Sequence, residues 1–102
     1  MSDDEKDAAI LRLVKNRSEA KQRKLMLESE LRAAGESLSE IGQSLRHLNG
    51  GPYDNIGRII PQIDKAPDIC GLERIKTMLA ELSRLKEMLA KMDKSATELG
   101  IA

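Results

Sequence analysis

Apolar side chains recur at alternating intervals of three and four residues through the first half of the chain. A heptad repeat runs without a break from residue 10 to residue 48, and only Arg17 and Lys24 interrupt its apolar a and d positions. This spacing is typical of a helix that packs along one seam, as in a coiled coil. It predicts a long helix over residues 3–48. The a positions are Ile10, Arg17, Lys24, Leu31, Leu38 and Leu45, and the d positions are Leu13, Ala20, Leu27, Ala34, Ile41 and Leu48.

Residues at both ends of the repeat support these helix boundaries. Ser2 and Glu5 have the spacing of a capping box, and the acidic residues 3–5 suit the positive end of the helix dipole. The run Asn49-Gly50-Gly51-Pro52 ends the helix, because asparagine, glycine and proline favour its termination.

Residues 49–68 are predicted to form an apolar connector. Isoleucines at positions 56, 59, 60 and 63 recur at helical spacing, so we expect this segment to pack against the helices instead of acting as a flexible linker. Asp54 is placed to cap one short turn that ends before Pro61. A second long helix is then expected over residues 69–99, with Asp68 as its N-cap and Gly100 as its stop.

Two long helices on either side of a Gly-Gly-Pro sequence most simply fold into an antiparallel hairpin, so the chain is predicted to be one all-α domain over residues 1–102. The second helix should cover the first back to about residue 17, leaving an overhang with Ile10, Leu11, Leu13 and Val14. Burial of each aliphatic side chain is worth about 1.5–3 kcal/mol. We therefore expect a homo-oligomer, with a dimer favoured, that forms a four-helix or larger bundle. The predicted self-association residues are Ile10, Leu13, Leu27, Leu31, Leu38, Ile41, Leu82, Leu85 and Leu89.

Composition argues against most other classes of protein. Tyr53 is the only aromatic residue, and 33% of the residues are charged, which is unlike a β-sandwich and typical of long helices. Cys70 and His47 are single, so neither a protein-only zinc site nor any cofactor site is expected, and no catalytic motif occurs. There is no run of 18 apolar residues, and a lone cysteine suits a reducing compartment. We expect a non-enzymatic, cytoplasmic protein without a membrane span.

The formal net charge is zero, but positive charge is concentrated in residues 12–24. This basic segment is interpreted either as a solvated part of the coiled coil or as a contact for a partner or a phosphate group. The predicted function is a non-catalytic protein–protein interaction module that self-associates and has room for a second protein partner. The alternative is a small helical nucleic-acid-binding regulator. Gly35 and Gly42, seven residues apart, are open to two interpretations, as close helix-packing sites or as a hinge. The cations of the basic segment are Arg12, Lys15, Arg17, Lys21, Arg23 and Lys24.

Overall fold

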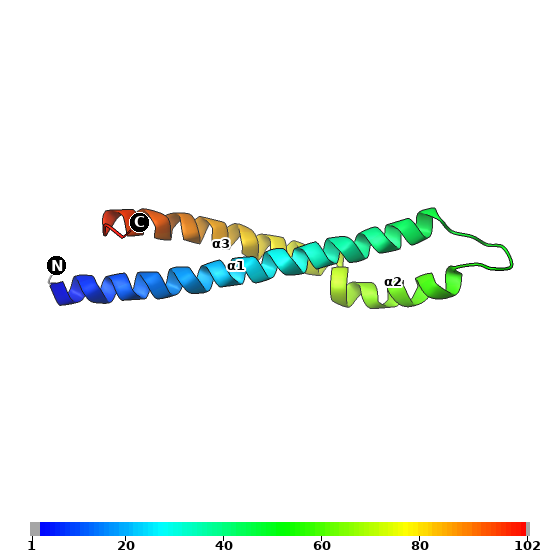
Figure 1. Cartoon of the computed structure of the whole chain (residues 1–102), viewed down its shortest axis with the longest axis horizontal. Coiled ribbons are helices and arrows are strands. Elements are labelled where there is room, and N and C mark those ends of the chain that lie inside the picture. The colour runs from blue at the N-terminus through cyan, green and yellow to red at the C-terminus, as the bar shows by residue number, and fades with distance from the viewer. Residues whose placement is uncertain (1–2, 102) are drawn as a thin grey trace. The chain divides into compact units, whose positions relative to one another are not determined.

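The computed structural model describes residues 3–101, and three helices account for most of them (Figure 1). They are α1 (Asp3–Arg46), α2 (Ile56–Cys70) and α3 (Leu72–Glu98). The prediction of an all-α chain with two long helices is confirmed. Ser2, half of the predicted capping box, lies outside the described residues. Within the described part of the chain, no helix is both long enough and apolar enough to cross a membrane.

Helix α1 ends two residues earlier than predicted, in a loop held by asparagine side chains. The backbone N–H of Asn49 donates to Oδ1 of Asn55 over 3.1 Å, and Nδ2 of Asn55 donates to the carbonyl of His47 over 3.3 Å. The N–H of Gly51 donates to Oδ1 of Asn49 over 2.9 Å. Asparagine side chains compete with helical backbone hydrogen bonds, so the chain leaves the helix where they accumulate.

The connector prediction is wrong in one respect, because most of residues 49–68 lie in a 15-residue helix. The N-cap is Asn55 and not the predicted Asp54, and its side chain makes no capping hydrogen bond. Oδ1 of Asp54, one residue earlier, accepts a hydrogen bond from the N–H of Ile56 over 3.2 Å. The helix does not end before Pro61 but continues through Pro61 and Pro67 to Cys70. The second long helix consequently begins at Leu72, and residue 68 lies within α2 instead of capping α3.

Burial explains why α2 tolerates two prolines. Each proline removes one backbone hydrogen bond and crowds the carbonyl four residues earlier, at a cost of about 3 kcal/mol or more. This cost is opposed by burial of apolar side chains. Helix α2 buries Ile59 and Cys70, which are 4% and 2% exposed, and half-buries Ala66. Tertiary packing of an amphipathic face outweighs local helix propensity here.

Contacts group the chain into two packing units. The first unit joins the part of α1 up to Glu28 with the part of α3 from Ala80 onward, and the second spans Ser29–Leu79. In the first unit α1 and α3 run antiparallel, because the partner in α3 moves backward as the position in α1 advances: Arg17 pairs with Asp93, and Arg23 with Glu81. The buried side chains of the first unit are Ala20, Leu27, Leu85 and Ala96, and those of the second are Ala34, Ile59, Cys70 and Met78.

The predicted overhang at the start of α1 is shorter than expected. Arg17 lies 2.8 Å from Asp93, and α3 continues for five residues beyond that pair, to Glu98. Antiparallel helices advance by the same rise per residue, so α3 extends to about residue 12 of α1. Ile10 and Leu13 are accordingly half-buried.

The cause of this difference lies in the second unit. There α2 packs antiparallel along α1, so that Cys70 and Ala66 meet Ile41, while Ile59 lies near His47. Helix α2 thus covers the C-terminal stretch of α1 that the second long helix was expected to cover. Helix α3 begins its own pairing only at Glu30, which lies 3.6 Å from Arg74.

Candidate protein-binding surfaces

The predicted self-association residues mostly face the inside of the chain. Leu27 and Leu85 are buried, and Leu38 is the most exposed of the set at 41%. The heptad seam of α1 is therefore largely used by α3 and α2 within the packing units. The half-buried members are Ile10, Leu13, Leu31, Ile41, Leu82 and Leu89.

A different set of apolar side chains on α1 is left exposed. Leu11, Val14 and Leu25 are 71%, 52% and 63% exposed. At 100° per residue, the three side chains fall within about 60° of one another around the helix, about 120–180° away from the buried Ala20 and Leu27. The overhang predicted from the sequence includes Leu11 and Val14 but not Leu25, although the spacing of Leu25 from these two residues places it on the same side of the helix.

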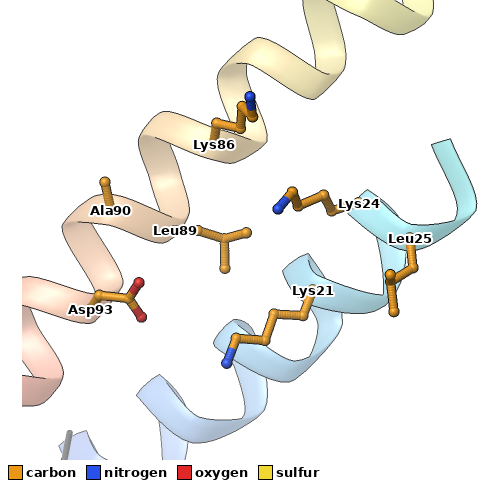
Figure 2. A pocket seen from close by; sticks show the side chains of 7 residues that line it. All are labelled: Lys21, Lys24, Leu25, Lys86, Leu89, Ala90 and Asp93. Atoms are coloured by element: carbon orange, nitrogen blue, oxygen red, sulfur yellow. The ribbon is translucent and has the colours of Figure 1, made fainter. Parts of the chain in front are cut away.

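A basic groove lies between α1 and α3 in the first unit (Figure 2). Its volume is about 460 Å³. Figure 2 shows Leu89 pointing from α3 into the space between the two helices, with Lys24 pointing toward it from α1. Three lysines against one carboxylate make the lining electropositive, and the side chains of Leu25, Leu89 and Ala90 make part of it apolar. The lysines are Lys21, Lys24 and Lys86, and the carboxylate is Asp93.

Part of the charge of the basic segment is neutralised within the first unit. Arg23 donates two hydrogen bonds to the Glu81 carboxylate, from Nε over 2.7 Å and from Nη2 over 3.0 Å. This bidentate contact is the main reason that the pKa of Glu81 lies below its ordinary value of 4.5. Lys24 lies 3.7 Å from Glu28.

The remaining cations of the basic segment differ in environment. Arg17 is half-buried and bonds Asp93 through Nη2, while its Nε is covered and has no hydrogen-bond partner. Arg12, Lys15 and Lys21 are exposed and form no salt bridge within residues 3–101. Only part of the segment is thus available to an external partner.

Helix α2 carries a second exposed apolar surface, which we call the α2 face: Ile56, Ile60, Ile63 and Pro67. The three isoleucines are 42%, 55% and 46% exposed and lie one helical turn apart, beside the buried Ile59. The helical spacing of these isoleucines was predicted from the sequence, but they were expected to pack against the long helices, whereas only Ile59 is buried.

The groups capable of chemistry are dispersed. Cys70 is buried, and His47 is exposed in the turn after α1. Among the described residues, no group of three or more His, Cys, Asp or Glu side chains is placed to hold a metal ion. Comparisons of the chain with protein-family models, with curated proteins and with solved structures find no match.

Proposed function

We propose that this protein is a non-catalytic helical interaction module that associates with a second copy of itself in the cytoplasm. One observation carries the proposal: both packing units leave large aliphatic side chains in water. Leu11, Val14 and Leu25 are more than half exposed in the first unit, and Ile60 is 55% exposed in the second. Groups of exposed apolar side chains of this kind mark interaction sites.

The energetic scale supports association through these surfaces. Full burial of one aliphatic side chain contributes about 1.5–3 kcal/mol, and these side chains are about half exposed, so each could add roughly 1 kcal/mol. A symmetric dimer uses the same patch on both copies, which doubles the contribution. Four to six such side chains per copy would offset much of the entropy lost on association. Two α1–α3 pairs would then form a four-helix assembly.

Light scattering coupled to size-exclusion chromatography tests the proposal. At micromolar concentrations we expect a dimer of about twice the 11.3 kDa chain mass, retained at high salt because apolar burial is not screened. Replacing Leu11 and Val14 together by Gln, or Ile60 and Ile63 together by Gln, should identify the face that contributes.

Tyr53→Gln serves as the matched control, because Tyr53 is 92% exposed in the loop. A chain that elutes with the mass of a monomer at every concentration, or a dimer that neither paired substitution weakens, would overturn the proposal.

The alternative function, nucleic-acid binding through residues 12–24, has weaker support. Arg17, Arg23 and Lys24 already pair with carboxylates of the same chain. Zero net charge also removes the long-range attraction that phosphate binding uses. A gel shift with duplex or single-stranded nucleic acid that weakens steeply with salt would favour this alternative.

A further inference from the structure

Helix α1 carries a second line of side chains, which we call the N-terminal seam and which shares the a positions Ile10 and Arg17 with the seam that packs on α3. Its six members are spaced by four, three, four, three and four residues, which keeps them within about 80° of one another on a helix. Four are exposed, whereas Ile10 and Arg17 are half-buried. The N-terminal seam consists of Asp3, Asp7, Ile10, Val14, Arg17 and Lys21.

The order of side-chain types along the N-terminal seam is acidic, acidic, apolar, apolar, basic, basic. From the C-terminal end of the N-terminal seam, the order of side-chain types is reversed: basic, basic, apolar, apolar, acidic, acidic. An antiparallel copy centred at residue 12 therefore meets its complement at every step: Asp3 faces Lys21, Asp7 faces Arg17, and Ile10 faces Val14. A parallel copy in the same register would set carboxylate against carboxylate and cation against cation, which destabilises pairing.

We propose that two copies of the chain pair antiparallel through the N-terminal seam, in the register that joins Asp3 to Lys21. This inference rests on the proposed self-association and adds its surface, its orientation and its register. The apolar pair Ile10 and Val14 lies at the centre on both sides of the two-fold axis, and the ion pairs lie at the two ends.

The charged ends of the N-terminal seam are available to a second copy. Asp3, Asp7 and Lys21 are exposed, and within residues 3–101 none of them forms a salt bridge. Arg17 is already held by Asp93 at 2.8 Å, which fixes its guanidinium beside the seam. Asp7 of the second copy would share this guanidinium with Asp93, so the contact of Asp7 with Arg17 contributes less than the contact of Asp3 with Lys21.

The basic groove of Figure 2 lies at the same place. Lys21, Lys24 and Lys86 line it, and the proposed register sets the acidic first turn of the other copy against Lys21 at the groove. The lining thus carries the charge that complements Asp3. Leu89 supplies apolar surface beside Lys21.

Charge reversal at the two ends of the N-terminal seam tests the register. Lys21→Glu and Asp3→Lys each replace two attractive contacts per dimer with two repulsive ones. Each variant alters two exposed ion pairs per dimer, so either should raise the dimer Kd about 5- to 30-fold at low salt, which corresponds to about 1–2 kcal/mol. The double variant D3K/K21E restores opposite charges across the dimer and should return the Kd to within about threefold of the original value.

Two matched controls separate this effect from general consequences of charge. Asp4→Lys makes the same change in the first turn of α1, and therefore the same unfavourable change with the helix dipole, on a different side of the helix. Lys15→Glu makes the same change as Lys21→Glu, also off the N-terminal seam. Both controls should change the Kd less than threefold, as measured by sedimentation equilibrium.

The outcomes distinguish the two proposals. A wild-type chain that stays monomeric throughout the concentration range overturns both the self-association and the N-terminal seam. A wild-type dimer that Lys21→Glu and Asp3→Lys leave as stable as their controls overturns the seam alone. Failure of the double variant to recover, with its helical content intact by circular dichroism, also overturns the proposed register.

Discussion

Substitution of Leu27 by Ala measures the packing of α1 against α3. Leu27 is 0% exposed and is the largest fully buried side chain in the described residues. The substitution removes about three carbon groups, worth about 0.8 kcal/mol each on transfer, and adds a cavity term. The expected loss of unfolding free energy is therefore about 3–5 kcal/mol. Since a domain of this size has about 5–15 kcal/mol in total, the loss is large.

Urea unfolding followed by far-UV circular dichroism is the appropriate assay. With a slope of about 1.5 kcal/mol per molar, a loss of about 3 kcal/mol lowers the midpoint by about 2 M. Met26→Ala is the matched control, because Met26 is the neighbouring residue and is 55% exposed. The control should cost about 1 kcal/mol or less, since it leaves no enclosed cavity. Equal losses for Leu27→Ala and Met26→Ala would refute the assignment of this face of α1 to the core.

Three further predictions follow from particular contacts. A Cβ added at Gly71 would lie 2.7 Å from the Pro67 carbonyl oxygen, so Gly71→Ala should lower the unfolding free energy by about 1–3 kcal/mol. A Cβ added at Gly35 would meet no atom within 4 Å, so Gly35→Ala should raise the unfolding free energy by about 0.5–1 kcal/mol. Urea titration measures both, and a destabilising Gly35→Ala would indicate that another chain packs there. Because the pKa of Glu81 is lowered in the folded state, its contribution to stability is present above pH 4.5 and is lost as the pH falls through the folded-state pKa. Glu81→Gln should therefore reduce the loss of unfolding free energy at acidic pH. An unchanged dependence of the unfolding free energy on pH would contradict this. The buried Cys70 thiol should react with a thiol reagent slowly in buffer and rapidly in urea, and equal rates would show that the packing of α2 against α1 does not cover it.

The heptad repeat predicted the covered side of α1 well. Ala20, Leu27 and Ala34 are successive d positions, and all three are buried. The prediction succeeded because a helix of this length presents a side chain to the same direction every three or four residues, whichever element lies opposite. It did not identify the exposed Leu25 as part of a surface, because Leu25 lies outside the a and d positions.

Local sequence signals did not predict the extent of α2. Pro61 and Pro67 argued for a broken connector, since proline disfavours helix interiors by about 3 kcal/mol. The burial of Ile59 and Cys70 against α1 reversed that preference, and such burial depends on a surface formed by residues far away in the sequence. Gly35 and Gly42 were predicted to be either close helix-packing sites or a hinge. Within the described residues no other helix approaches either glycine closely, so they are not packing sites within the chain.

By itself, the sequence determined that the chain is helical and which side of α1 is covered, because periodicity acts over a few turns. The tertiary structure alone decided what covers each stretch of α1, with α3 on the N-terminal part and α2 on the C-terminal part. It also decided which apolar side chains are left exposed. Whether α2 or α3 covers a given stretch of α1 depends on how much apolar surface each of them buries there, and this is determined only in the folded chain.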